Sequence, residues 1–194
     1  MLAKLSLAGP VHDPPFGHTS GYVGYAVHAE AWSWLETQIR PYLADAGRVL
    51  DFGGYDVNGS PRALFSRATD YVVLDARDGP NVDIVADAVT WTPSRELRGS
   101  FDVTLCTEVF EQVEHWRGIL YNLWLTSKAA GTCLITCATD PRPPHSISGM
   151  VPPPPGEWYR NVAPDELLLP VRFLFRRADH VVQPRGDLYI RAVK

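Results

Sequence analysis

The chain has 194 residues, of which 45% are hydrophobic and 21% are charged. Such values are typical of soluble globular proteins and exclude a disordered, collagen-like or coiled-coil chain. The formal net charge of −4 disfavours nucleic acid as a partner, because binding to phosphate backbones depends on clustered Lys and Arg. The sequence has no apolar run long enough to span a bilayer, so we expect a single cytoplasmic domain of residues 1–194 with no membrane partner.

The three cysteines, Cys106, Cys133 and Cys137, include no Cys-x-x-Cys pair, so neither a secreted disulfide framework nor a zinc site is expected. Cys133 and Cys137 are four residues apart on an expected strand. That spacing separates them by about 13 Å, which is too far for a disulfide. We expect all three to be reduced thiols in the core.

The first segment, residues 1–45, is expected to be a Pro- and Gly-rich leader followed by an amphipathic helix. Apolar residues recur at helical spacing from Trp32 through Leu35 to Ile39, and Pro41 should end or kink the helix. We interpret this segment as a leader and lid helix that precede a sheet.

The second segment, residues 46–139, begins with a strand and a glycine turn and is expected to form a cofactor-binding core. An apolar strand at 48–52 leads into Gly53 and Gly54. Ser60 then precedes Pro61, a pairing typical of a capped helix start.

The remainder of this segment continues to alternate between strands and helices. A helix is expected at 113–130, closed by Gly131, before a strand at 132–137. Three short strands that each end in polar residues come earlier, at 71–74, 82–85 and 101–105.

The last two segments are 140–170, a Pro-rich insert expected on the acceptor side, and 171–194, which should hold the closing strands. The stretch 140–155 has seven prolines in sixteen positions, so it cannot supply hydrogen-bond donors to a sheet and must be a surface loop. Pro164, Asp165 and Glu166 should open a short helix. Two strands, at 173–175 and 188–193, could pair as a hairpin at one sheet edge.

Strands that alternate with helices predict a parallel sheet covered on both faces. We therefore predict an α/β fold with a Rossmann-like, doubly wound, mostly parallel sheet and an antiparallel C-terminal edge hairpin. Ligands of such sheets bind at the carboxyl ends of the strands, where the strand order reverses. Gly53 and Gly54 allow a ligand to approach the backbone, and Asp75 is placed to bind a ribose diol. The sequence thus indicates a nucleoside site.

Several strings occur in order at strand–helix spacing, and together they resemble the class I S-adenosylmethionine-dependent methyltransferases over residues 47–139. The strings are Val49-Leu50-Asp51-Phe52-Gly53-Gly54, Leu74-Asp75, Ala86-Asp87-Ala88, Phe101-Asp102-Val103 and Thr107-Glu108-Val109. The resemblance implies S-adenosylmethionine as cofactor and transfer of a methyl group to a small-molecule O or N acceptor by in-line displacement. Compact chains of this type with a Pro-rich insert look similar to chains encoded by bacteriophages and actinobacteria.

Carried over by motif position, the resemblance implies a set of cofactor contacts at the strand ends. These are Asp51, Gly53, Gly54, Asp75, Asp87, Ala88, Cys106, Thr107 and Glu108. The methionine part would lie at Asp51 and the glycine turn, the ribose at Asp75, and the adenine at Asp87 and Ala88. The last three residues would line the cofactor next to the transferred methyl group.

One departure from the family pattern bears on metal binding. In ubiquinone-type O-methyltransferases the region after the fourth strand reads Glu-Val-x-Glu-His and can hold a divalent metal, whereas this chain has Gln112 at the His position. An amide oxygen is a poorer ligand than imidazole for transition metals, and His115 would point elsewhere on a helix. We predict no metal.

The acceptor is expected to lie between the leader and the Pro-rich insert. His145 is the candidate general base, because an imidazole titrates near neutrality and this one is in the long loop after the fifth strand. Arg160 would pair with an anionic substrate. The full set of candidate substrate-binding residues is His18, Tyr22, Tyr25, Tyr159 and Arg160.

Three other functions are considered. Asp13-Pro14-Pro15-Phe16 matches the Asp-Pro-Pro-Tyr/Phe signature of DNA amino-methyltransferases, but it does not follow a strand, and we interpret it as a coincidence in a Pro-rich leader. An NAD(P)-dependent oxidoreductase could use the same sheet, although the Tyr-x-x-x-Lys of short-chain dehydrogenases is missing. A nucleoside-binding protein without turnover also stays open, because the glycine turn departs from Gly-x-Gly-x-x-Gly.

Overall fold

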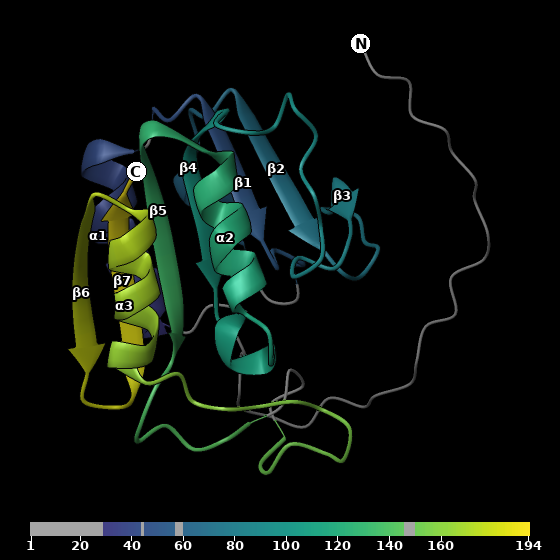
Figure 1. Ribbon diagram of the computed structural model, residues 1–194, viewed down its shortest axis with the longest axis vertical. Coiled ribbons are helices and arrows are strands. Elements are labelled where there is room, and N and C mark those ends of the chain that lie inside the picture. Colours follow the sequence, from purple (N-terminus) through teal and green to yellow (C-terminus); the bar gives the residue numbers. More distant parts are fainter. Residues whose placement is uncertain (1–28, 44, 57–59, 146–149) are drawn as a thin grey trace.

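The structure, a computed structural model, describes residues 29–43, 45–56, 60–145 and 150–194. Within this part of the chain, seven strands form one sheet in the order β3-β2-β1-β4-β5-β7-β6 (Figure 1). Strands β1 to β5 are parallel, and β7 is antiparallel to both β5 and β6. The predicted mostly parallel sheet with an antiparallel C-terminal edge hairpin is confirmed.

The elements follow the expected alternation along the chain. The strands are β1 Arg48–Phe52, β2 Asp70–Asp75, β3 Ile84–Val85, β4 Phe101–Thr107, β5 Ser127–Ala138, β6 Arg177–Gln183 and β7 Asp187–Val193. The α-helices are α1 Ala29–Tyr42, α2 Arg117–Thr126 and α3 Pro164–Leu174, and two short 3-10 helices are η1 Pro61–Leu64 and η2 Phe110–Gln112. No described helix combines the length and apolar character needed to traverse a bilayer.

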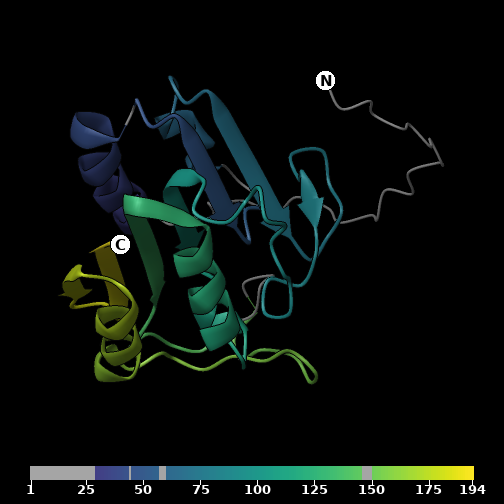
Figure 2. The ribbon, with the colours of Figure 1, turned by 45° about the horizontal axis from the view of Figure 1, so that its top comes forward.

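Two hydrophobic cores lie on opposite faces of the sheet, because successive side chains of a strand point to opposite faces. Leu50 and Phe52 of β1 pack with α2 and α3 on one face. Val49, directly before Leu50, packs with α1 and η1 on the other face. Figure 2 shows α2 and α3 on one side of the sheet and α1 on the other. The three cysteines are free thiols buried in the α2–α3 core, as predicted.

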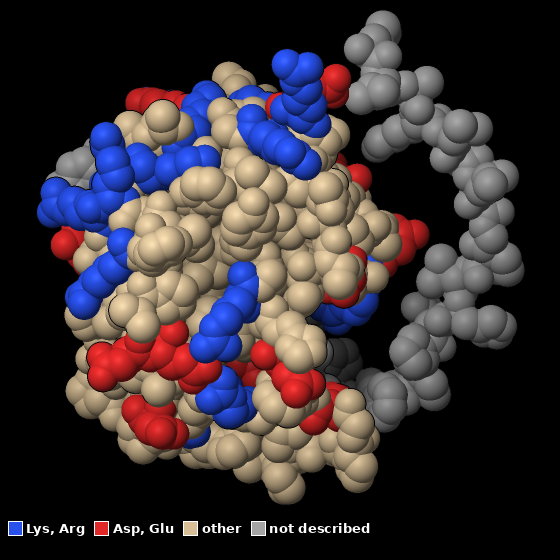
Figure 3. Space-filling model, viewed as in Figure 1, with Lys and Arg blue, Asp and Glu red and all other residues tan. Residues whose placement is uncertain are grey.

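The parallel strands give the sheet two chemically different edges. The carboxyl ends of β1 to β5 meet at one edge, here called the carboxyl edge, and their amino ends meet at the amino edge. The segment between β5 and α3 crosses the molecule at the carboxyl edge (Figure 1). Over α3 and β6, basic side chains gather toward the amino edge and acidic ones toward the carboxyl edge (Figure 3).

The helix expected at 113–130 is shorter than predicted. It ends at Thr126, because the hydroxyls of Thr126 and Ser127 bind the carbonyls of Asn122 and Leu123, and β5 starts at Ser127. Gly131 does not close a helix. A Cβ there would lie 2.9 Å from the Lys128 carbonyl oxygen, so the glycine permits an irregular turn inside β5.

The strand expected at 173–175 is also wrong, because Phe173 and Leu174 form the last turn of α3. Leu167 and Val171 bury the inner face of that helix. The true partner of β7 is β6, at Arg177–Gln183, whose mostly exposed and largely polar sequence carries no strand-like apolar pattern. The predicted start at Ser60 is confirmed, since its side chain accepts from the Arg62 amide, but η1 is a single turn.

Candidate functional site

The turn after β1 requires glycine at two consecutive positions. Gly53 has a φ of +75°, and a Cβ there would lie 2.4 Å from Cγ2 of Val109. A Cβ on Gly54 would lie 2.6 Å from Oδ2 of Asp51. Any other residue would therefore strain the backbone or collide with its neighbours. The turn brings bare peptide groups directly over the end of β1.

Asp51 is fully buried beneath this turn. Its Oδ2 accepts a hydrogen bond of 2.8 Å from the Tyr71 hydroxyl, whereas its Oδ1 has no hydrogen-bond partner among the described residues. Burial raises the pKa of Asp51 to about 7, the Tyr71 hydrogen bond opposes this rise, and the negative charge of Asp75 adds to it. A positively charged ligand group would stabilise the ionised carboxylate.

Asp75 ends β2 next to the glycine turn. Its Oδ2 accepts from the amide of Tyr55 at 3.2 Å, and its Oδ1 accepts from the amide of Arg77 at 2.9 Å. The Arg77 guanidinium lies 4.1 Å from the centre of the Tyr55 ring. One carboxylate thus holds the glycine turn and the end of β2 side by side.

Asn81, which sequence reasoning missed, fixes the glycine turn from the loop after β2. Its Nδ2 donates to the Gly54 carbonyl at 2.7 Å, and its Oδ1 accepts from the Asp56 amide at 3.1 Å. Both polar groups of one side chain therefore hold the same loop. The only sequence signal is an Asn directly after Pro80, which indicates a turn and nothing about its partner.

Asp87 and Ala88 lie in the turn that follows β3. Asp87 is exposed, and its Oδ1 accepts from the Val89 amide at 2.9 Å, so it stabilises its own turn. The buried Asn122 of α2 donates to the carbonyls of Ala88 and Trp91, at 3.1 and 2.7 Å. This anchors the turn to the helix and leaves the Asp87 carboxylate at the surface of the carboxyl edge.

The end of β4 places Cys106, Thr107 and Glu108 in three different environments. Cys106 is fully buried in the core, Thr107 is buried, and the Glu108 side chain is mostly buried. Glu108 has a φ of +56°, a left-handed conformation that is unfavourable for a residue with a side chain. Its Oε2 accepts from Arg142 at 2.8 Å, and Arg142 also donates to Asp187 at 2.7 Å. Arg142 therefore joins the Pro-rich insert to β4 and β7.

Glu111, on η2, is a second buried carboxyl at this edge. It is fully buried, and neither of its oxygens makes a hydrogen bond of normal geometry to a described residue. Burial raises its pKa to about 8, the charge of Glu108 adds to the rise, and Arg142 opposes it. Glu111 corresponds to the second Glu of the Glu-Val-x-Glu-His string considered in the sequence analysis. Sequence reasoning could not show that it is buried, because its burial depends on the Pro-rich insert that crosses this edge.

The Pro-rich insert brings residues that were predicted to bind the methyl acceptor to the carboxyl edge. Nε2 of the Gln112 side chain donates to the backbone carbonyl of His145 at 3.4 Å, and the centre of the His145 ring lies 4.9 Å from that of the Tyr159 ring. The Tyr159 hydroxyl donates to Asn161 at 2.9 Å. Gln112 stands where ubiquinone-type O-methyltransferases have a histidine. It thus contacts the loop that carries the candidate base, His145.

Arg160 is held away from these rings by an ion pair. Its guanidinium donates two hydrogen bonds to Glu166 of α3, at 2.9 and 2.8 Å. Contact with an anionic substrate would require Arg160 to leave Glu166. His18, Tyr22 and Tyr25, and the string 13–16, lie outside the described residues.

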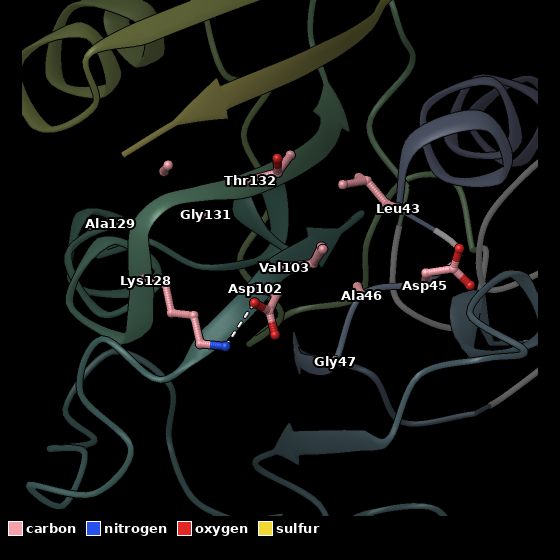
Figure 4. A pocket seen from close by; sticks show the side chains of 11 residues that line it. Leu43, Asp45, Ala46, Gly47, Asp102, Val103, Lys128, Ala129, Gly131 and Thr132 are labelled. Atoms are coloured by element: carbon pink, nitrogen blue, oxygen red, sulfur yellow. Dashed lines mark hydrogen bonds and ion pairs between the residues drawn. The ribbon is translucent and has the colours of Figure 1, made fainter.

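A pocket of about 310 Å³ lies at the other edge of the sheet (Figure 4). It is lined by the chain before β1, the start of β4 and the first half of β5, and it contains the ion pair between Lys128 and Asp102 at 2.7 Å. The charges of Lys128 and Asp102 therefore neutralise each other. None of the predicted site residues lines this pocket. Across the described ranges, no group of three or more His, Cys, Asp and Glu could hold a metal ion.

The fold of this chain is similar to that of solved methyltransferase structures. The Burkholderia thailandensis 1,6-didemethyltoxoflavin-N1-methyltransferase, with 1,6-didemethyltoxoflavin and S-adenosylhomocysteine bound, is 14% identical over 84% of this chain and 77% of its own, with a TM-score of 0.59. A Mesorhizobium loti S-adenosylmethionine-dependent methyltransferase is 15% identical over 86% and 98%, with a TM-score of 0.60.

A third similar structure is the N-methyltransferase NodS of Bradyrhizobium japonicum WM9 in complex with S-adenosylhomocysteine. It is 11% identical over 85% of this chain and 86% of its own, with a TM-score of 0.60. No protein-family profile and no curated protein sequence matches this chain. These likenesses show that the chain has the Rossmann-like fold of class I S-adenosylmethionine-dependent methyltransferases.

Proposed function

We propose that this protein is an S-adenosylmethionine-dependent methyltransferase that transfers a methyl group to an oxygen or nitrogen of a small molecule. The observation that supports this most strongly is the buried Asp51 carboxyl, whose Oδ1 has no partner among the described residues. It lies under the glycine turn of a sheet with the methyltransferase strand order. The fold alone would not distinguish this activity from other uses of a layered sheet.

The residues present fit a cationic sulfur nucleoside. Because Gly54 has no Cβ, which would lie 2.6 Å from Oδ2 of Asp51, the peptide groups of the turn can lie directly against the Asp51 carboxyl. Carboxylates at the ends of β1 and β2 favour positive charge, and this cofactor carries both an ammonium and a sulfonium group. When bound, S-adenosylmethionine would supply an electrophilic methyl group.

The chain's own residues would orient the cofactor at three points. Asp51 and the peptide groups of Gly53 and Gly54 would hold the methionine part. Asp75 would accept hydrogen bonds from the ribose, in exchange for its present contact with the Arg77 side chain. Asp87 is exposed and ionisable at the surface of its turn, which suits the adenine amino group.

The acceptor would lie between the end of β4 and the Pro-rich insert. Cys106, Thr107 and Glu108 would border the position of the transferred methyl group, as their place after β4 suggests. His145 would remove the acceptor's proton, because a neutral imidazole is the side chain best matched to proton transfer near pH 7. Tyr159 would hold the His145 ring in place by the contact that the two rings already make.

Calorimetry with S-adenosylmethionine, S-adenosylhomocysteine and NAD tests the cofactor. We expect both sulfur nucleosides to bind and NAD not to bind. Asp75→Asn should weaken binding at least about tenfold, because it removes a charged hydrogen-bond acceptor. Asp70→Asn is the matched control, since Asp70 starts the same strand at the opposite edge and pairs with Arg48. NAD binding, or equal affinities in the two variants, would contradict the proposal.

A transfer screen with a tritium-labelled methyl group over small molecules, protein and DNA tests turnover and the acceptor. With an acceptor in hand, His145→Ala should lower kcat by about a hundredfold and leave the cofactor dissociation constant unchanged. His180→Ala, on the exposed strand β6, is the control. Unchanged turnover of His145→Ala across pH would show that His145 is not the base. Cofactor binding without any transfer would favour a nucleoside-binding protein.

A further inference from the structure

Helix α3 is apolar on two opposite faces, only one of which is covered. Leu167, Leu168 and Val171 are buried against the sheet. On the other face, Leu169 is 76% exposed and Phe173 is 89% exposed, the two largest values among the big hydrophobic side chains of the described residues. They are four residues apart and therefore neighbours on the helix surface. Adjacent large hydrophobic side chains this exposed are typical of an interaction surface.

The charges around this apolar pair are divided by sign along the helix. Asp165 is exposed in the first turn of α3, whereas Arg172 is exposed in the last turn and Arg176 just beyond it. Asp165, Leu169 and Arg172 recur at intervals of four and three residues, so they form one stripe on the helix, and Arg176 lies just beyond its end. Figure 3 shows the same division, with acidic side chains over the lower end of α3 and basic ones over its upper end.

We propose that this stripe is the interface of a homodimer in which α3 packs antiparallel against α3 of a second copy. Leu169 is the middle residue of the helix, so a two-fold axis passing beside it would bring residues equally distant from it together. Asp165 of each copy would then lie against Phe173 and beside Arg172 of the other. Each copy would supply both signs of charge, and Leu169 and Phe173 would form the apolar centre.

The self-complementary pattern favours a second copy over a different partner. A partner that was uniformly acidic would be repelled by Asp165, and a uniformly basic one by the arginines. An antiparallel copy satisfies both ends at once and closes with two subunits. Tyr121 of α2, which is 51% exposed on the same face of the sheet, could widen the contact.

The size of the surface sets the expected affinity. A helix of this length is about 16 Å long, so the contact would be smaller than the ~1,600 Å² of a standard stable interface. We therefore expect a dissociation constant in the micromolar range rather than a permanent dimer. The proposed dimer rests on the surface of α3 alone, so it does not depend on the proposed methyl transfer.

Sedimentation velocity of the full chain over a range of micromolar concentrations tests the dimer. The wild type should shift from monomer to dimer as concentration rises. Phe173→Glu should stay monomeric throughout, because it buries a charge at the apolar centre. Val85→Glu, at an exposed position on β3, should dimerise like the wild type. A wild type that stays monomeric, or a Phe173→Glu variant that still dimerises, would overturn the proposal.

Charge reversal tests the antiparallel arrangement separately from folding. Asp165→Arg and Arg172→Asp should each raise the dissociation constant about tenfold, because each is repeated twice by symmetry and places like charges together. The double variant should recover most of the affinity, and a mixture of the two single variants should form heterodimers. Circular dichroism of each variant serves as the control for folding. Failure of the double variant to recover would exclude antiparallel pairing.

Discussion

The two edges of the sheet carry similar acidic residues in opposite chemical states. At the amino edge, Asp102 accepts hydrogen bonds from the Arg48 amide at 2.8 Å and from Lys128 at 2.7 Å. Although partial burial opposes it, these hydrogen bonds keep the pKa of Asp102 below its usual value. At the carboxyl edge, burial raises the pKa of Asp51 to about 7 and that of Glu111 to about 8.

Each edge also holds a non-glycine residue in the left-handed backbone region. At the carboxyl edge this is Glu108, which has a φ of +56° directly after β4. At the amino edge, Ala130 has a φ of +62° in the irregular turn of β5, but the charges beside it are paired. Strain combined with incompletely bonded buried acids is characteristic of a functional site. The comparison teaches that the acid at the amino edge is fully paired, whereas buried carboxyl oxygens of Asp51 and Glu111 at the carboxyl edge have no hydrogen-bond partner among the described residues.

Removal of the basic partner at each edge should have very different effects. Arg142→Met should lower the free energy of unfolding by about 3 kcal/mol, because it leaves the mostly buried Glu108 and Asp187 without their cation. Lys128→Met should lower it by less than about 1 kcal/mol, since its pair with Asp102 is partly exposed. Urea denaturation measures both. If both variants lost the same free energy of unfolding, the mostly buried ion pairs of Arg142 would contribute no more to stability than the partly exposed pair of Lys128.

Substitution of one glycine near each edge compares how closely the backbone turns are packed there. Gly53→Ala combines a left-handed φ with a collision against Val109, so we expect a loss of at least about 2 kcal/mol in unfolding free energy. Gly99→Ala is the matched change near the amino edge. Its φ is +59°, but a Cβ there meets only the Ser127 carbonyl oxygen at 3.9 Å, so only the backbone term of about 1 kcal/mol applies. A Gly99 variant as unstable as the Gly53 variant would contradict the argument from close packing.

The pH dependence of stability should differ between the edges in sign. The folded pKa of Glu111, about 8, exceeds its unfolded value of 4.5, so the folded state holds a proton that the unfolded state releases. Its contribution to stability is complete below the unfolded pKa and is lost as pH rises toward the folded pKa. The limiting loss is about 1.4 kcal/mol per pH unit for each such group.

Two amide variants separate these contributions in urea denaturation at a series of pH values. Glu111→Gln should flatten the decline between about pH 5 and pH 8, because an amide does not titrate there. Asp102→Asn should leave that slope unchanged, because the lowered pKa of Asp102 gives a contribution that is lost only as pH falls through the folded value. An unchanged slope in Glu111→Gln would mean that this carboxyl is ionised in the folded protein.

The sequence could predict the features of this molecule that depend on local pattern. The apolar runs predicted strands β1 to β5, and the paired glycines predicted the turn over Asp51. The boundary between α2 and β5 could not be found, because it depends on hydroxyl–carbonyl bonds at Thr126 and Ser127 rather than on apolar spacing. Strand β6 was missed because, as an exposed edge strand, it needs no apolar face of its own.

The partners within the candidate site are set by contacts between distant parts of the chain. Asn81 reaches Gly54 across 27 positions, and Arg142 reaches Asp187 across 45. A single sequence contains no periodicity that links such pairs. It could therefore place acidic residues at strand ends, but it could not show which of them would be paired and which would be left without a hydrogen bond.

Substitution of the exposed Asp87 or the partly exposed Asp70 should have the smallest effects on stability. The two substitutions should nevertheless differ in their effect on cofactor binding, because the two residues lie at opposite edges of the sheet. Asp87→Asn keeps an oxygen that can accept from the Val89 amide, and its new NH2 group can donate to the Thr90 hydroxyl that now donates to Oδ2, so unfolding should change by no more than about 0.5 kcal/mol. Loss of the negative charge should nevertheless weaken S-adenosylmethionine about tenfold in calorimetry. Asp70→Asn should change neither quantity appreciably, because Asp70 pairs with Arg48 at the amino edge. If both variants bound the cofactor equally well, Asp87 would be a residue that only stabilises its own turn, and the nucleoside would have to be recognised by the other two acids.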